Sequence, residues 1–382
     1  MIQAKNLAIL GSTGSVGRQS LEIVNEFPEK YHVSILAAGK NSVLLEEQIS
    51  LFNPDLVLIE DDEAHQKIKS KFPAHPKEIK RYNNDFDLPL NEHKIDLVIN
   101  ALPSIHGFIA SFLTLKKGIN LALANKESLL IAGDLIMATA EESGSKILPI
   151  DSEASAIFQC LEGENPKDIE KIYLTASGGP FYKNRKNKVS KSDVLQHPVW
   201  SMGPKISVDS ATMMNKAFEM YEIHQLFNIP LNKIEVIIHP ESIIHSMIQF
   251  KDGQIKALIS EPNMKMPIAH AMSYPKRHSA SIKSINIFNS NWNFEPLVPG
   301  KFPCFDMALT FLKKGKSFPA ALVTINDHFV NAFLNNEIEF EEIGSSIIST
   351  MKSIESRQLS DLTDVVEYVK ECQEKCLQIV KS

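Results

Sequence analysis

The stretch that decides the fold is Gly11-Ser12-Thr13-Gly14-Ser15-Val16-Gly17, which follows an apolar run at Leu7–Leu10 and opens a helical pattern at Ser15–Phe27. Glycines at its first, fourth and seventh positions permit a tight turn and let a pyrophosphate approach the N-terminus of the helix. A glycine pattern alone is weak evidence, because ordinary strand–helix turns have similar sequences. Here the loop lies inside a βαβ pattern near the start of the chain, which favours a dinucleotide-binding site.

Short apolar runs alternate with helical patterns over the first 150 residues. Because the runs are continuously apolar, we expect strands buried on both faces, in a Rossmann-like, doubly wound parallel sheet. The predicted strands are Leu7–Leu10, Val33–Ala38, Leu56–Ile59, Asp96–Asn100, Asn120–Ala124 and Lys146–Ile150. The uncharged stretch Leu97–Leu115 contains Pro103 and Gly107, so it predicts a strand followed by a helix and not a membrane span.

The pattern changes after the predicted sheet, and we expect an α/β protein of three parts. Residues 1–150 would form the dinucleotide-binding domain and residues 151–275 an α+β catalytic domain with a flap near 182–203. Residues 276–303 read as a linker, and 304–382 as a C-terminal helical bundle rich in Lys and Glu.

Composition narrows the function classes. The 382 residues carry 40 Lys and Arg against 46 Asp and Glu, and without a basic block we expect neither nucleic acid nor a membrane as the main partner. Four cysteines are too few and too scattered to predict a disulfide framework, and from the residues of the N-terminus we expect no export signal. We therefore expect a soluble, cytoplasmic protein.

The end of the second predicted strand indicates which dinucleotide would bind. NAD-binding sites commonly place an Asp or Glu there to bind the ribose hydroxyl groups. This sequence instead has Ala37-Ala38-Gly39-Lys40-Asn41, which favours the 2′-phosphate of NADP. On its own, Lys40 is also compatible with a solvated loop lysine.

Two acidic motifs predict a metal site. Asp151-Ser152-Glu153 follows the last predicted strand, where α/β sheets bind ligands, and in an extended segment both acids would point the same way. The same three residues also suit the start of a helix, because Asp and Ser are common N-caps and Glu favours the first turn.

The second motif is Ser207–Glu219, for which we expect a helix starting near Ser210. Asn215, Lys216 and Glu219 would then share one edge of that helix. The alternative to a functional cluster is a plain surface ion pair between Lys216 and Glu219. Converging carboxylates require a cation, and ligands that are all oxygen suit Mg²⁺ or Mn²⁺ rather than Zn²⁺.

A possible anion pocket and flap lie between these motifs. Thr175–Phe181 offers hydroxyl groups and glycine amides that could hold a phosphate, although by itself it is a common turn. A polar stretch with five Lys or Arg residues, Tyr182–Gln196, follows it and leads to His197–Gly203. Trp200 there suggests a lid over a ligand, the alternative being a side chain that anchors the loop to the core.

Together these motifs resemble the 1-deoxy-D-xylulose 5-phosphate reductoisomerase family of the non-mevalonate isoprenoid pathway. The resemblance covers the chain from about Leu7 to Met272, and the helical tail also fits. The matching blocks are the glycine loop, AAGKN at Ala37–Asn41, ANKES at Ala124–Ser128, DSE at Asp151–Glu153, ASGGPF at Ala176–Phe181, HPVWSMG at His197–Gly203, SVDSATMMNKAFE at Ser207–Glu219, HPESIIHSM at His239–Met247 and EPNMKMPIAHAM at Glu261–Met272.

The resemblance implies an NADPH-dependent enzyme, with Mg²⁺, Mn²⁺ or Co²⁺, that rearranges the substrate and reduces it to 2-C-methyl-D-erythritol 4-phosphate. It implies metal ligands Asp151, Glu153 and Glu219, and contacts from Lys126, Ser152 and Glu153 at the substrate's reacting end. It implies phosphate contacts from Ser177, His197, Ser210, Asn215 and Lys216, and a flap residue, Trp200. The NADPH contacts would be Thr13, Gly14, Ser15, Val16, Gly39, Lys40, Asn41, Asn125, Glu127 and Gly203.

The resemblance also implies a homodimer. The chain departs from the family at Ala154, where His is frequent, at Val199, where Asn is common, and at Glu241, where Gln is usual. Two other functions compete with this one. A simple NADP-dependent dehydrogenase of a phosphorylated sugar would need no cluster of three carboxylates, and a non-enzymatic NADP sensor would not need Lys216 and Glu219 together in one pocket.

Overall fold

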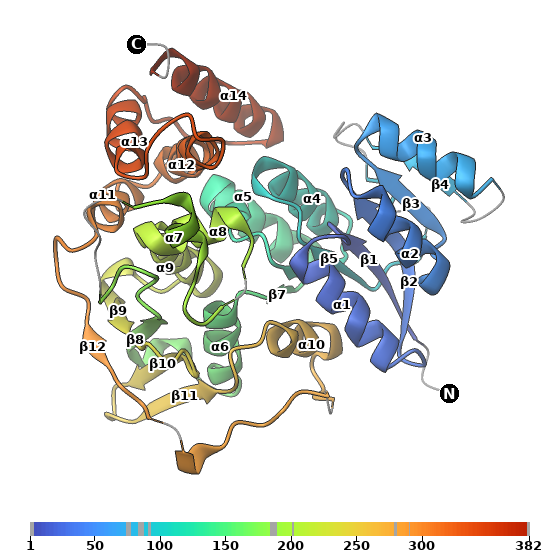
Figure 1. Ribbon diagram of the computed structural model, residues 1–382. Helices are drawn as coiled ribbons and strands as arrows, with labels where there is room; N and C mark the ends of the chain where they lie inside the picture. The colour runs from blue at the N-terminus through green and yellow to red at the C-terminus, as the bar shows by residue number, and fades with distance from the viewer. Residues whose placement is uncertain are drawn as a thin grey trace. The chain divides into compact units, whose positions relative to one another are not determined.

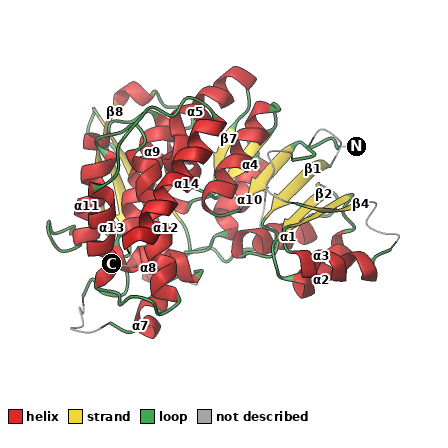
Figure 2. Ribbon diagram, turned by 90° about the horizontal axis from the view of Figure 1, so that it is seen from above, coloured by secondary structure: helices red, strands yellow, loops and turns green. Residues whose placement is uncertain are grey.

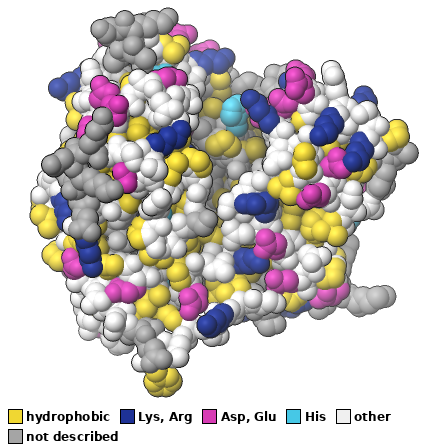
Figure 3. Space-filling model, viewed as in Figure 1, with side chains coloured by type: hydrophobic (Ala, Val, Ile, Leu, Met, Phe, Trp, Pro, Cys, Tyr) yellow, Lys and Arg dark blue, Asp and Glu magenta, His cyan; other side chains and the backbone are white. Residues whose placement is uncertain are grey.

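The computed structural model describes residues 4–73, 78–82, 88–90, 93–183, 189–200, 202–278, 281–289 and 291–379 (Figure 1). The chain forms two compact units. The first comprises Met1–Asn125, Ile136–Asp151 and Asn263–Ile282, and the second Lys126–Leu135, Ser152–Pro262 and Lys283–Ser382. Among the described residues, no helix is both long and apolar enough to cross a membrane. On the face drawn in Figure 3, basic and acidic side chains are interspersed.

The first unit is built on a parallel sheet of seven strands in the order β4-β3-β2-β1-β5-β6-β7. The order reverses at β1, so the loops after β1 and β5 flank the crevice where such sheets bind ligands. Figure 2 shows these strands in yellow with red helices beside them. The strands are β1 Lys5–Leu10, β2 Tyr31–Ala38, β3 Leu56–Ile59, β4 Glu78–Arg81, β5 Leu97–Asn100, β6 Asn120–Leu123 and β7 Ile147–Pro149.

All six predicted strands are confirmed, with small differences in their bounds, and β4 was not predicted. Its sequence, Glu-Ile-Lys-Arg, is polar and only half buried because β4 is an edge strand. By contrast, Leu7–Leu10 in β1 is completely buried. The helices of this unit are α1 Ser15–Glu26, α2 Ser42–Phe52, α3 Asp62–Lys71, α4 Ser104–Lys116 and α10 Lys265–Ser273, together with the second part of α5 Glu127–Ser143, which is kinked at Ala132.

The second unit contains a mixed sheet of five strands, in the order β11-β10-β8-β9-β12. Only β8 and β9 pair in parallel, and α6 packs on β10 and β11. The strands are β8 Ile169–Ala176, β9 Ile234–Ile238, β10 Ile244–Phe250, β11 Ile255–Ile259 and β12 Glu295–Pro296. The helices are α6 Ser152–Cys160, α7 Lys191–Leu195, α8 Pro204–Thr212, α9 Met214–Phe227, α11 Pro303–Leu312, α12 Phe318–Leu334, α13 Glu342–Lys352 and α14 Leu362–Ile379.

The grouping of segments differs from the three-part division expected from the sequence. Asn263–Ile282 belongs to the first unit, because α10 packs against α1, β6 and β7. The C-terminal helices form one compact unit with the mixed sheet, because α11 and α12 pack against α8 and α9. The stretch read as a linker contains β12, which pairs with β9.

The predicted helix start near Ser210 is wrong. A helix already begins at Pro204, because proline is well suited to the first helical turn after Gly203. It ends at Thr212, where Met213 adopts a left-handed backbone conformation with φ of 60°, and a new helix begins at Met214. Ser210 therefore lies in the last turn of α8, while Asn215 lies in the first turn of α9.

Candidate active site

The glycine loop of the first unit has a geometry that only glycine permits. Gly11 has a φ of +84°, and a Cβ added to it would lie 2.8 Å from the carbonyl oxygen of Ala101. A Cβ on Gly17 would lie 2.4 Å from the carbonyl oxygen of Gly11. Within the described part of the chain, no side chain caps the first turn of α1. Its backbone amides are therefore suited to an anion, and the loop fits a dinucleotide's pyrophosphate.

The loop after β2 holds the residues expected to bind the adenosine end of the cofactor. Asn41 caps α2 by accepting a hydrogen bond from the backbone N–H of Leu44, at 3.2 Å, and Lys40 is exposed. An acid that the sequence pattern did not predict approaches this loop from the end of β3. The Glu60 carboxylate lies 3.6 Å from the position of a Cβ on Gly39.

The other predicted cofactor residues are divided between the units. Asn125 is buried in the first unit, and a Cβ on Gly107 of α4 would lie 2.4 Å from its Cγ. Because Gly107 has no side chain, there is room for Asn125 in this position, a role for Gly107 that the sequence pattern did not predict. Glu127 and Gly203 belong to the second unit.

The three predicted metal ligands come together. One carboxylate oxygen from each of Asp151, Glu153 and Glu219 lies within 4.8 Å of the other two. Asp151 is only two residues before Glu153, so the chain itself keeps it beside α6. Glu153 is in the first turn of α6, so the helix-start alternative is correct, and the acids nevertheless converge. An all-oxygen donor set of this kind fits Mg²⁺ or Mn²⁺.

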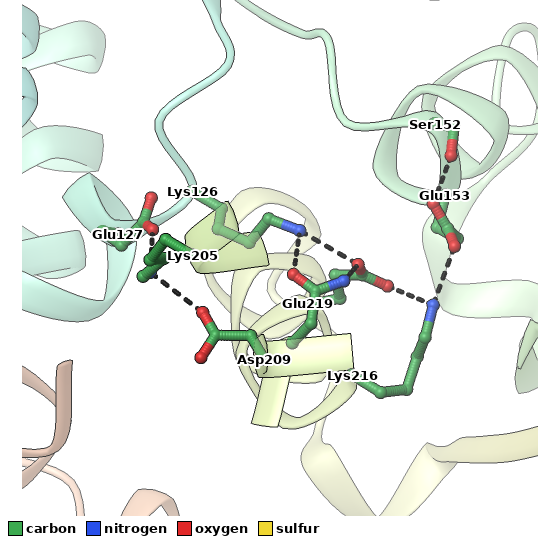
Figure 4. A network of polar contacts seen from close by, with 9 residues as sticks. Lys126, Glu127, Ser152, Glu153, Lys205, Asp209, Lys216 and Glu219 are labelled. Atoms are coloured by element: carbon green, nitrogen blue, oxygen red, sulfur yellow. Dashed lines mark hydrogen bonds and ion pairs between the residues drawn. The ribbon is translucent and has the colours of Figure 1, made fainter. Parts of the chain in front are cut away.

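Two lysines, Lys126 and Lys216, contact the Glu153 and Glu219 carboxylates in one polar network (Figure 4). Lys126 Nζ lies 2.9 Å from Glu219 Oε1 and 3.0 Å from Asn215 Oδ1. Lys216 Nζ lies 2.7 Å from Glu153 Oε1 and also contacts the other Glu219 oxygen. Ser152 donates its hydroxyl hydrogen to Glu153.

This network is buried, so the plain surface ion pair considered from the sequence is wrong. Glu219 is 2% exposed and Lys216 5% exposed. Burial by itself lowers the pKa of the Lys216 ammonium, but Glu153 and Glu219 more than compensate and hold that pKa above its ordinary value. Lys216 therefore stays charged and partly neutralises the acids.

Ser177 and His197 form a set of fixed hydrogen-bond donors at the end of β8. His197 Nδ1 accepts hydrogen bonds from the backbone N–H groups of Val199 and Trp200, at 3.2 and 2.9 Å. Because burial, with help from Lys216, lowers the pKa of His197 to about 4, the ring is neutral at pH 7. Its single proton is therefore on Nε2, which lies 3.0 Å from Ser177 Oγ.

Ser177 is consequently poised to donate. Its Oγ accepts hydrogen bonds from His197 Nε2 and, at 3.2 Å, from the backbone N–H of Gly179. Both lone pairs of the hydroxyl oxygen are then used, and the hydroxyl hydrogen is left for an anion. Ser210 lies beside the same turn, because a Cβ on Gly179 would lie 2.6 Å from its carbonyl oxygen.

The flap near 182–203 can be described only in part, because residues 184–188 and 201 lie outside the described ranges. The Trp200 side chain is half buried, with its ring centroid 6.2 Å from that of His245. His245 Nε2 in turn lies 2.8 Å from Ser260 Oγ. This contact is what the anchor interpretation expects, and both interpretations of Trp200 stay predictions.

A second group of charges was missed in the sequence analysis. Lys205 Nζ lies 2.7 Å from Glu127 Oε1, 3.0 Å from Asp209 Oδ2 and 3.1 Å from Asp327 Oδ1. Lys205 and Asp209 are at i,i+4 in α8, which is the one signal the sequence offered. Asp327 comes from α12, and no local pattern links it to α8.

Of the three departures from the family pattern, Glu241 has the most distinct role. Its carboxylate accepts hydrogen bonds from the backbone and side-chain nitrogens of Asn293, and one of its oxygens lies 3.1 Å from His239 Nδ1. It thus ties the segment before β12 to the end of β9. Ala154 is buried in α6, and Val199 lies in the flap.

Comparison with known proteins identifies the family of the chain. A family model described as 1-deoxy-D-xylulose 5-phosphate reductoisomerase matches residues 7–133, and two models of C-terminal domains of the same enzyme match residues 147–227 and 259–375. The reductoisomerase of Chloroherpeton thalassium is 41% identical over 367 residues, which cover 95% of each chain. That of Geotalea daltonii is 39% identical over 383 residues, covering 99% of this chain and 100% of the relative.

Solved structures are similar over the whole length. The reductoisomerase of Zymomonas mobilis, in complex with NADPH, is 32% identical with a TM-score of 0.90, covering 100% of both chains. A reductoisomerase in complex with NADPH, fosmidomycin and magnesium is 30% identical with a TM-score of 0.92, covering 99% of this chain and 98% of the other. On these matches, the chain belongs to the 1-deoxy-D-xylulose 5-phosphate reductoisomerase family.

Proposed function

We propose that this chain converts 1-deoxy-D-xylulose 5-phosphate into 2-C-methyl-D-erythritol 4-phosphate, by rearranging the carbon skeleton and reducing the product with NADPH. The observation that carries the proposal is the convergence of Asp151, Glu153 and Glu219 within 4.8 Å. Plain hydride transfer does not need such a site, whereas cleavage of a carbon–carbon bond beside a ketone is assisted by a Lewis acid.

The reacting end of the substrate would lie against this carboxylate group. Mg²⁺, Mn²⁺ or Co²⁺ bound there would polarise the ketone and lower the pKa of the adjacent hydroxyl. Lys126 and Ser152 would donate hydrogen bonds to the same oxygens. Their contacts with Glu219 and Glu153 support these roles, because both donors already lie beside the acids.

The phosphate end of the substrate would be held by neutral donors together with one cation. The Ser177 hydroxyl hydrogen is available, and Ser210 lies beside the same turn. Asn215 and Lys216 would complete the pocket from the first turn of α9. Holding the phosphate keeps both fragments of the substrate in place while the new bond forms.

NADPH would bind to the first unit through Thr13–Val16 at the start of α1 and Gly39–Asn41 after β2. Asn125, Glu127 and Gly203 would contact the rest of the cofactor. The uncapped amides of α1 and the glycine contacts in the loop support this placement. Trp200 would cover the carbon backbone of the substrate as part of the flap.

We also propose that the chain acts as a homodimer in the cytoplasm. The segment around β12 exposes large apolar side chains, which soluble monomers rarely leave in contact with water. Phe288 is 97% exposed and Ile287 61% exposed. Light scattering coupled to size exclusion tests the assembly, and Phe288→Asp should shift the mass towards a monomer if this segment is at the interface.

The deciding experiment follows the oxidation of NADPH, by the loss of its nicotinamide absorbance, with 1-deoxy-D-xylulose 5-phosphate and with or without Mg²⁺. We expect turnover only with the metal, and Glu219→Gln should lose most of it while NADPH still binds. Glu170→Gln, which alters an exposed carboxylate on β8, is the matched control and should behave like wild type.

The alternatives give different results in the same assay. A simple dehydrogenase of a phosphorylated sugar would oxidise NADPH without added metal and give a product with an unbranched skeleton. A sensor would bind NADPH and turn over nothing. Equal loss of NADPH binding and of turnover in Glu219→Gln would indicate that Glu219 supports the fold instead of a metal.

A further inference from the structure

Lys205 lies at the centre of a charge cluster, and its own ammonium has no role in the proposed reaction. Its ammonium contacts Glu127 at 2.7 Å, Asp209 at 3.0 Å and Asp327 at 3.1 Å. The three acids belong to α5, α8 and α12, so one side chain joins three helices. Figure 4 shows Lys205 between Glu127 and Asp209.

The three acids of the cluster are largely shielded from solvent, whereas the Lys205 side chain is 26% exposed, and the cluster remains charged. The Asp209 side chain is only 2% exposed, and those of Glu127 and Asp327 are 15% and 18% exposed. Burial lowers the pKa of Lys205, but the three acids together raise it well above its ordinary value. Asn326 also donates a hydrogen bond to Asp209, at 2.8 Å. Shielded contacts between full charges are strong and directional, so they fix the helices that carry them.

Two of these acids are adjacent in sequence to residues of the candidate active site. Glu127 follows Lys126, whose ammonium contacts Asn215 and Glu219. Asp209 precedes Ser210 in the last turn of α8. Lys205 therefore holds the backbone from which Lys126 reaches the carboxylates, although its own ammonium contacts none of the three metal-ligand candidates.

We propose that Lys205 is a positioning residue, which holds the start of α5 through Glu127 so that Lys126 stays on Glu219 in the orientation that the reaction needs. The inference rests on the proposed function, because Lys126 acts on the substrate only there. A displacement of about 1 Å in such a group costs on the order of 100-fold in rate.

The test is a double-mutant cycle between Lys205→Met and Lys126→Met, with kcat measured at saturating NADPH and Mg²⁺. Saturation keeps weaker cofactor binding out of the comparison. We expect Lys205→Met to lower kcat by roughly 30- to 100-fold in the wild-type background and by less than about threefold in Lys126→Met, because the residue through which it acts is then missing. Lys205→Arg, which keeps the charge, should recover most of the rate.

Two further variants separate positioning from stability. Asp327→Asn removes one charge from the cluster but leaves the contact between Lys205 and Glu127, so its kcat should stay near that of wild type. Glu127→Gln weakens that contact without leaving a cavity, because glutamine has nearly the same size as glutamate. We expect this variant also to lower kcat only when Lys126 is present. It replaces Lys205→Met in the cycle if the methionine variant does not fold.

The outcomes are distinct. An equal fold-loss in both backgrounds, or an unchanged kcat in Lys205→Met, overturns the positioning role. If the wild-type protein shows no metal-dependent turnover of 1-deoxy-D-xylulose 5-phosphate, the proposed function fails, and the inference fails with it.

Discussion

Replacing Asn326 with aspartate places two carboxyl groups against each other inside the second unit. Asn326 Nδ2 lies 2.8 Å from Asp209 Oδ1, and both residues are 1% exposed. Asn326→Asp keeps the shape of the side chain but exchanges the donor for an acid. At that distance two full charges would repel by about 6 kcal/mol for an effective dielectric constant near 20.

Protonation of the new carboxyl group costs less free energy than burying two charged carboxylates side by side. With an ordinary pKa of about 3.9, holding a proton at pH 7 costs about 4 kcal/mol, and the protonated group can again donate to Asp209. The folded variant then binds one proton more than its unfolded state. Its free energy of unfolding relative to wild type must therefore fall by about 1.4 kcal/mol for each unit of rising pH.

Urea unfolding of both proteins between roughly pH 6 and pH 8 measures this slope. Both tryptophans of the chain, Trp200 and Trp292, belong to the second unit, so their fluorescence reports on the part that carries the change. Asn331→Asp, at an exposed position of the same helix, is the control and should cost less than about 0.5 kcal/mol. If the unfolding free energy of Asn326→Asp is less than about 1 kcal/mol below that of wild type, or if the difference does not depend on pH, the reasoning is refuted.

Three other predictions concern separate parts of the chain. Burial lowers the pKa of His245 from 6.5 to about 4. The free energy of unfolding of wild type should therefore fall by roughly 3 kcal/mol relative to that of His245→Gln between pH 7 and pH 4. Equal pH profiles of the unfolding free energy in the two proteins would contradict this. Gly107→Ala should displace Asn125 and weaken NADPH binding at least tenfold. Titration calorimetry measures the affinity, and an unchanged affinity would contradict this prediction. Glu60→Gln should raise the ratio of kcat/KM for NADPH to that for NADH several-fold, because it removes a negative charge near the 2′-phosphate, whereas Glu63→Gln in α3 should leave the ratio unchanged.

Local patterns explain what the sequence could predict. The glycine loop and the strands around it depend on neighbouring residues, and Leu7–Leu10 is as buried as its continuous apolarity predicts. Each half of the carboxylate site was predictable for the same reason, since Asp151 and Glu153 are neighbours and Asn215, Lys216 and Glu219 are close on one helix. The meeting of the two halves joins segments distant in sequence.

The remaining features depend on contacts between distant segments or on a single backbone torsion. Asp327 meets Lys205 only after α12 packs on α8, and their separation in sequence hides the pair. Glu60 reaches the cofactor loop from the next strand of the sheet. The break between α8 and α9 rests on the left-handed Met213, a conformation that its residue type does not favour.

The burial of His197, together with the nearby Lys216 ammonium, also determines how the proposed phosphate pocket responds to acidity, because it lowers the pKa of the ring. A ring that remains neutral until about pH 4 gives the pocket the same charge throughout the range in which cells operate. The species that does titrate there is the ligand, since a phosphate monoester exchanges its second proton near pH 6. Any dependence of substrate affinity on pH around that value would then report the ionisation of the substrate rather than a change in the protein.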